Sequence, residues 1–289
     1  MTVLASAEGI TPAHAIQPAL LVVAILLLGL GFAAGGGYQV VSRHTLRASD
    51  EYRGPSPILC FGIVLVLGTV SGVVLAILGL SPTGENAAPF VANLVAVLVS
   101  YVLVVWLLVV RTGSLSWREM GWPVGRAIGV LATDVVVGAG VTLVAMIAIG
   151  VLALVVSALL GGVQAPDILP TSRAPLDVAL IALATVVIAP LGEELFFRGF
   201  SLTAWWRDLG PRSALIRSAL FFAVVHVLNI TADDFATGLR QVILVVAQIL
   251  PLAFVLGWLF IRRGIGASIA GHMTYNAVVL IAALSAHAI

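Results

Sequence analysis

The stretch PLDVALIALATVVIAPLGEELFFRGFSLTA, residues 175–204, is an apolar run with a group of charged side chains inside it. About 20 mostly apolar residues suffice for a helix to cross a bilayer, so this run predicts a transmembrane helix. Glu193, Glu194 and Arg198 lie well inside the run. Ionisable groups at membrane depth cost a few kcal/mol each, and they are therefore candidates for a functional role.

The composition of the whole chain places it in lipid. Its 289 residues are 61% hydrophobic and only 9% charged, whereas a soluble domain carries roughly 25% charged residues. Mean hydropathy is +1.17. We therefore expect an integral membrane protein whose partners are membrane lipid and a peptide or membrane-protein substrate. The net charge of +1 and the lack of a basic stripe predict no nucleic-acid partner.

Eight apolar runs are long enough to span a bilayer, and short polar connections separate them. The sequence predicts an all-α membrane protein, a polytopic bundle of about eight transmembrane helices. The run 127–161 is long for one span and short for two; we keep it as one tilted or protruding helix. The runs cover about 17–41, 58–80, 90–110, 127–161, 175–204, 213–230, 240–261 and 265–287.

Arginine placement predicts the orientation of this bundle. The odd-numbered connections hold Arg43, Arg47, Arg53, Arg111, Arg118, Arg126, Arg207, Arg212, Arg262 and Arg263, and the even-numbered ones hold only Arg173 and Arg240. Because basic residues collect on the cytoplasmic side, the odd connections are expected to be cytoplasmic. Both termini would then lie outside a multi-pass protein of the cytoplasmic membrane.

Three runs carry polar groups at a similar expected depth. A helix rises 1.5 Å per residue, which puts Glu193 roughly 21 Å from Arg207 and His226 roughly 21 Å from Arg212. The same count from Arg263 gives roughly 14 Å for His272 and 20 Å for Asn276. We expect these groups to meet inside the bundle.

Spacing within the helices separates the two adjacent glutamates. Glu194 and Arg198 are four residues apart, so they share a helix face and can form an ion pair. Glu193 points about 100° away and can face a cavity. Pro190 removes one backbone hydrogen bond just before the pair and can kink the helix, leaving room for water.

Three motifs resemble one known family. The segments EELFFR (Glu193–Arg198), FAVVH (Phe222–His226) and HMTYN (His272–Asn276) are similar to the EExxxR, FxxxH and HxxxN motifs of the CPBP family. That family comprises CAAX prenyl endopeptidases and bacteriocin-processing or immunity (Abi) proteins. The resemblance covers about 175–287 and implies an intramembrane protease. We expect residues 1–126 to hold three helices without a recognised motif. Residues 127–289 would hold the catalytic core, with the active site inside the C-terminal four-helix core.

The resemblance implies that Glu193, His226, His272 and Asn276 are catalytic, and chemistry suggests their roles. A glutamate in an apolar pocket suits a general base, which we assign to Glu193, with His226 orienting the water and relaying the proton. His272 and Asn276 would donate hydrogen bonds to the oxyanion. The Glu194–Arg198 pair would support the turn that carries the base.

The candidate residues are compatible with a metal-dependent site and with a metal-free one. Family members are often described as metalloproteases, and Glu193, His226 and His272 could supply three ligands beside a water, as catalytic zinc requires. The chain has no HExxH motif, however, and Asn276 is a poor zinc ligand. The expected cofactor is therefore none or one divalent metal such as zinc.

Other readings of the same residues remain open. Buried Glu and His sets also serve proton-coupled membrane transporters, although no inverted repeat is evident. A non-catalytic immunity or scaffold membrane protein could keep the motifs unused. Phe222 reads most simply as packing, Asp134 as a helix partner or a charge near the cytoplasmic interface, and Arg217 as a side chain that snorkels to the cytoplasmic surface. Cys60 reads as a small buried hydrophobe.

Overall fold

The computed structural model describes residues 12–80, 87–123, 125, 127–166, 169–228, 230 and 232–286. Within these ranges every regular element is a helix, and seven helices are long and apolar enough to cross a membrane. The prediction of an all-α polytopic bundle is confirmed. Arg126 and the two chain ends, on which part of the predicted orientation rests, lie outside the described residues.

The N-terminal half contains four long helices. Their bounds are α1 Pro12–Leu46, α2 Pro57–Ile77, α3 Ala87–Val105 with its π-helical continuation η1 Trp106–Val110, and α4 Ile128–Leu159. The helix α4 is single and unbroken, as the sequence predicts for 127–161.

The C-terminal half begins with a long run of alternating α and π turns. Its elements are α5 Pro175–Ala182, η2 Leu183–Ile188, α6 Ala189–Glu194, η3 Leu195–Leu202, α7 Thr203–Val227, α8 Phe235–Arg263 and α9 Ile265–Ala286. π-Helical turns are rare and occur often at functional sites. Here η2 and η3 flank the turn that carries Glu193 and Glu194.

The count of seven rather than eight spans has a local cause. Residues Pro175–Val227 form one helical run of 53 residues. Gly210 interrupts it with a φ of 76°, a left-handed conformation that glycine adopts at little cost, and Pro211 follows. The chain bends there into two arms, in the segment that the sequence marks as the connection between its fifth and sixth spans.

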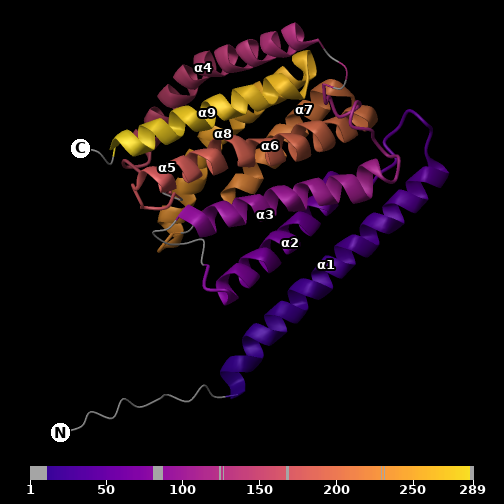
Figure 1. The fold of residues 1–289 in the computed structure, drawn as a ribbon, viewed down its shortest axis with the longest axis horizontal. Coiled ribbons are helices and arrows are strands. Elements are labelled where there is room, and N and C mark those ends of the chain that lie inside the picture. Colours follow the sequence, from indigo (N-terminus) through magenta and orange to yellow (C-terminus); the bar gives the residue numbers. More distant parts are fainter. Residues whose placement is uncertain are drawn as a thin grey trace.

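The helices around the acidic turn enclose it from several directions. In Figure 1, α1 lies at one edge of the bundle and α4 at the opposite edge, with α2, α3, α6 and α9 between them. The helix α4 packs against α8 and α9, and α6 packs against α3 and α9. The site is thus built mainly from α6, α7, α8 and α9, with α3 closing one side.

Buried aromatic rings fix the position of η3. Phe196, Phe197 and Phe200 are fully buried. The rings of Phe196 and Phe197 meet Phe61 of α2 and Tyr101 of α3 at centroid distances of 5.0–6.2 Å. Such aromatic clusters contribute large buried area with defined ring geometry. Through them, the N-terminal helices hold the segment that follows the two glutamates.

Candidate active site

Glu194 forms the expected ion pair with Arg198. The Arg198 Nη1 and Glu194 Oε1 atoms are 2.8 Å apart, and both side chains are fully buried. Arg198 also donates a longer bond to the Ala253 carbonyl of α8. A buried pair of this kind needs further hydrogen bonds to offset its desolvation.

Those further bonds come from α9, which the sequence analysis did not anticipate. The His272 Nδ1 atom lies 2.8 Å from Glu194 Oε1, and the Ser268 hydroxyl lies within hydrogen-bond distance of Glu194 Oε2. Glu194 therefore joins α6 to α9 as well as pairing along its own helix. Ser268 was not among the site residues predicted from the sequence. Its spacing could have indicated it, because Ser268, His272 and Asn276 follow one another at four-residue intervals on one helix face.

Glu193 faces both histidines, as predicted from the depth of the three groups. Its Oε2 atom is 3.9 Å from His226 Nε2 and 3.7 Å from His272 Nε2. These separations are too long for direct hydrogen bonds, and Glu193 Oε2 is buried without a hydrogen-bond partner among the described groups. A water molecule between these atoms has two protons to donate, so it would bridge Glu193 Oε2 and one of the two imidazole nitrogens.

The two glutamates and the residues beside them differ in side-chain exposure. The side chains of Glu193 and His226 are 23% and 24% exposed, whereas those of Glu194 and Arg198 are 0% exposed. The adjacent glutamates thus occupy different environments, one partly exposed and one enclosed by protein.

The second nitrogen of each imidazole is tied to an acceptor. His226 Nδ1 lies 2.8 Å from the Phe222 carbonyl oxygen, and His272 Nδ1 lies beside the Glu194 carboxylate. Because both partners only accept, each Nδ1 must carry a proton. The Nε2 atom of each neutral ring then presents a lone pair toward Glu193, so His272 can donate from Nε2 only as an imidazolium.

Phe222 does more than fill space. Its ring centroid is 4.3 Å from that of His226 and 5.7 Å from that of His272. The guanidinium carbon of Arg198 lies 4.1 Å from the centre of the same ring, within the range of a cation–π interaction. One buried ring therefore contacts both imidazoles and the arginine. The sequence predicted only a packing role for Phe222.

Asn276 is held by a backbone group that Pro190 leaves free. The Ala189 N–H bonds the carbonyl of Ala184, and Pro190 has no N–H to offer the carbonyl of Thr185. Asn276 Nδ2 donates to that Thr185 carbonyl at 2.8 Å. This hydrogen bond ties Asn276 to η2 rather than to Glu193 or a histidine. The second N–H of the Asn276 amide is left available for another acceptor.

Asp134 behaves as the helix partner that the sequence suggested. It is buried on α4, and its Oδ1 atom lies 3.8 Å from Arg263 Nη1 at the end of α8. The contact links two of the core helices.

The geometry does not favour a metal ion at this site. Ligands about 2.0–2.1 Å from a tetrahedral zinc lie roughly 3.3 Å from one another, and the separations around Glu193 Oε2 are 3.7 and 3.9 Å. Across the described residues, no set of three or more His, Cys, Asp or Glu side chains is arranged to hold a metal. The mechanism below therefore uses water and protein groups.

Comparison with known proteins assigns the segment that contains these groups. Residues 175–278 match the family of type II CAAX prenyl endopeptidase Rce1-like proteins. No curated protein and no solved structure matches the chain. The matched segment contains all three motifs quoted above, from Glu193 to Asn276, and the resemblance drawn from them is confirmed.

Proposed function

We propose that this protein is an intramembrane endopeptidase acting on membrane-associated peptides, since residues 175–278 match the Rce1-like family of type II CAAX prenyl endopeptidases, which are peptide hydrolases. One observation carries the proposal. A partly exposed carboxylate, Glu193, faces the Nε2 atoms of two imidazoles at 3.7 and 3.9 Å. In the proposed reaction these groups hold one water molecule, the second substrate of a hydrolase.

Glu193 is the general base in the proposed reaction. A water between Glu193 Oε2 and His226 Nε2 gives its proton to the carboxylate as its oxygen attacks the scissile carbonyl carbon. His226 orients this water because its Nδ1 is fixed on the Phe222 carbonyl, which directs the Nε2 lone pair into the site.

The negative charge that develops on the carbonyl oxygen needs donors. We assign this role to His272, as an imidazolium, and to the second amide N–H of Asn276. The carboxylates of Glu194 and Glu193, 2.8 and 3.7 Å from the two ring nitrogens, supply counter-charges to such an imidazolium. When the C–N bond breaks, the proton on Glu193 passes to the leaving amine, directly or through His226.

Glu194 and Arg198 act as positioning residues. Glu194 holds the His272 ring by its Nδ1, and Arg198 holds Glu194 and contacts the Phe222 ring. We also propose that 127–289 is the catalytic core, since α4 packs against α8 and α9. Substrate would approach from the cytoplasmic side.

The proposal is tested by Glu193→Gln, which keeps the side-chain shape and removes the base. With a prenylated peptide ending in a cysteine and three further residues as substrate, kcat should fall by about 100-fold or more. The matched control is Glu51→Gln, an exposed glutamate in the connection between α1 and α2. Both proteins are assayed after purification in detergent, with and without a metal chelator.

The outcomes are distinct. Loss of cleavage in Glu193→Gln with an unchanged melting temperature, and retention in Glu51→Gln, support the mechanism. Full activity of Glu193→Gln contradicts it. Activity that disappears on chelation and returns with zinc would contradict the metal-free form of the mechanism.

A further inference from the structure

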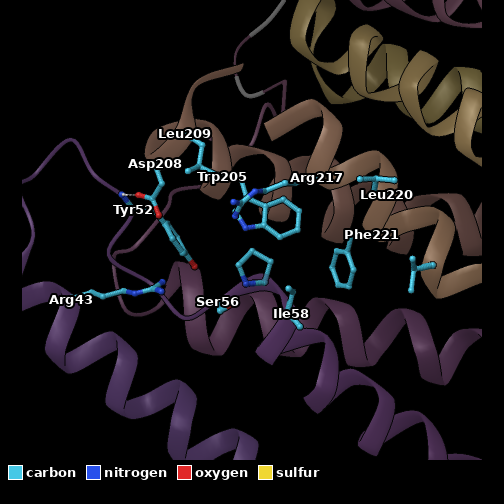
Figure 2. A pocket seen from close by; sticks show the side chains of 12 residues that line it. Arg43, Tyr52, Ser56, Ile58, Trp205, Asp208, Leu209, Arg217, Leu220 and Phe221 are labelled. Atoms are coloured by element: carbon cyan, nitrogen blue, oxygen red, sulfur yellow. Dashed lines mark hydrogen bonds between the residues drawn. The ribbon is translucent and has the colours of Figure 1, made fainter. Parts of the chain in front are cut away.

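A cavity of about 520 Å³ lies away from the catalytic groups. It sits between the connection that joins α1 to α2 and the two arms of the kinked helix at Gly210 (Figure 2). Glu193, His226 and His272 do not line it. Its volume is within the range of ligand-binding pockets, and the proposed reaction gives it no task.

Two arginines reach this cavity from different helices. Figure 2 shows Arg43 extending from α1 and Arg217 from α7. Arg43 donates to the Gly54 carbonyl, which occupies one of its five N–H groups. Within the described residues, neither arginine forms an ion pair with a carboxylate.

The single carboxylate in the lining is already neutralised. Asp208 is ion-paired with Arg47 at 2.8 Å and also accepts the Tyr52 backbone N–H. Arg47 is not part of the lining. The cavity therefore presents two guanidinium charges without a counter-charge, and burial raises the pKa of the Tyr52 phenol well above its usual value, so that side chain stays neutral.

The remaining wall of the cavity is apolar and faces outward from the bundle. Leu220 and Val224 follow Arg217 along one face of α7, and they are 48% and 61% exposed. Ile58, at the start of α2, faces the same space and is 63% exposed. The step from Arg217 to Val224 is seven residues, roughly 10 Å along the helix. The cavity thus has arginine side chains at one end and exposed apolar side chains along the rest of this wall.

We propose that this cavity is a binding site for one anionic phospholipid. The phosphate group would lie between Arg43 and Arg217, and one acyl chain would follow Leu220, Val224 and Ile58. Two unpaired guanidinium groups favour a net negative headgroup over a zwitterionic one. The apolar wall favours a lipid over a free anion, and the neighbouring Trp205 is of the type that anchors at a membrane interface.

The test measures lipid binding to the full chain, purified in detergent and stripped of lipid. Native mass spectrometry gives the dissociation constant for phosphatidylglycerol, with phosphatidylcholine of the same chains as the neutral comparison. Arg217→Gln is the main variant, because Arg217 is exposed and has no hydrogen bond or ion pair among the described residues. Arg212→Gln is its matched control, an exposed arginine on the same helix outside the cavity.

Arg217→Gln is expected to weaken phosphatidylglycerol binding by about tenfold or more, the usual effect of losing one charge-assisted hydrogen bond. Arg212→Gln should leave it unchanged, and phosphatidylcholine should bind about tenfold more weakly to the parent protein. Equal effects of the two substitutions, or equal binding of the two lipids, would overturn the proposal.

Two competitors distinguish other occupants. Inorganic phosphate that displaces the lipid at a similar concentration would make this a free-anion site. A short peptide with an apolar C-terminal end and a free carboxylate, displacing lipid where its C-terminal amide does not, would make it a peptide site. The lipid proposal expects neither. None of these readings depends on peptidase activity, so the result is independent of the proposed function.

Discussion

Glu193 and Glu194 are neighbours in the chain but have different partners. Glu194 Oε1 meets both Arg198 and His272 at 2.8 Å, in a fully buried position. Among the described residues, Glu193 Oε2 has no partner within hydrogen-bond distance. One helical step of about 100° separates a carboxylate that stabilises the bundle from one that is free to accept a proton.

The buried pair gives a prediction about stability. Glu194→Gln leaves Arg198 as an unpaired buried charge, and we expect the free energy of unfolding to fall by about 3–5 kcal/mol. Chemical denaturation in detergent micelles measures it. The comparison is Asp208→Asn, which breaks the partly exposed Arg47–Asp208 pair and should cost only about 0–1 kcal/mol.

A second variant separates charge from packing. Replacing both members, Glu194→Gln with Arg198→Met, removes the stranded charge and should recover part of the lost stability. If Glu194→Gln and Asp208→Asn cost the same, the buried network does not stabilise the bundle as described.

At the scale of elements, the π-helical turn η2 and Pro190 act together. The proline withholds a backbone donor from the Thr185 carbonyl, and Asn276 of α9 supplies one instead. An irregular turn in one helix thus fixes the orientation of a side chain on another.

Restoring the missing donor should disturb Asn276. Pro190→Ala provides a backbone N–H that can bond the Thr185 carbonyl, so we expect kcat to fall while the chain still folds. Because the two residues act through one hydrogen bond, the double variant Pro190→Ala with Asn276→Ala should be no slower than Asn276→Ala alone. Additive losses in kcat would show that the residues act separately.

A surface ion pair connects the segment after η1 to α7. Glu119 accepts hydrogen bonds from the Ser116 backbone and hydroxyl and is paired with Arg207. Partial burial raises the pKa of Glu119, but these hydrogen bonds and the arginine outweigh that effect and hold it below 4.5.

The lowered pKa predicts a pH-dependent stabilisation. A carboxyl group with a lower pKa in the folded state stabilises the fold fully above its unfolded pKa of about 4.5, and the stabilisation disappears as pH falls through the folded value. Glu119→Gln should therefore lower the melting temperature at pH 7, and the difference from the parent protein should shrink below about pH 4. A difference that stays constant with pH would mean that the charge of Glu119 does not matter.

The sequence predicted these elements to different degrees. Apolar length alone located the spans, since lipid requires it, and four-residue spacing paired Glu194 with Arg198 correctly. The bond between Glu194 and His272 could not be predicted, because it depends on the rotation of α9 relative to α6. The role of Thr185 depends on a π turn, for which one sequence carries no clear signal beyond the proline.

At the scale of the whole molecule, the arrangement of helices fixes which connections share a side. The predicted orientation, with odd-numbered connections cytoplasmic, can be tested because Cys60 is fully buried. We expect Asp233→Cys, between α7 and α8, to react with a membrane-impermeant maleimide on intact cells. Glu51→Cys, between α1 and α2, should react only after permeabilisation.

The parent protein serves as the background, since its one cysteine is enclosed. The reverse labelling pattern would invert the bundle, and it would move the proposed substrate entry to the outer side. Labelling of both positions on intact cells would contradict the eight-span topology itself.

The bend at Gly210 also bears on when the protein becomes active during its synthesis. It brings His226 beside Glu193 within a single helical hairpin, so those two groups can meet as soon as α7 has emerged. His272 belongs to α9, which follows α6 and α7 in the chain, and chains are made from the N-terminus onward. Until that helix inserts, Glu194 lacks its imidazole partner, so a nascent chain would acquire the proposed hydrolytic capacity only after α9 has entered the bundle.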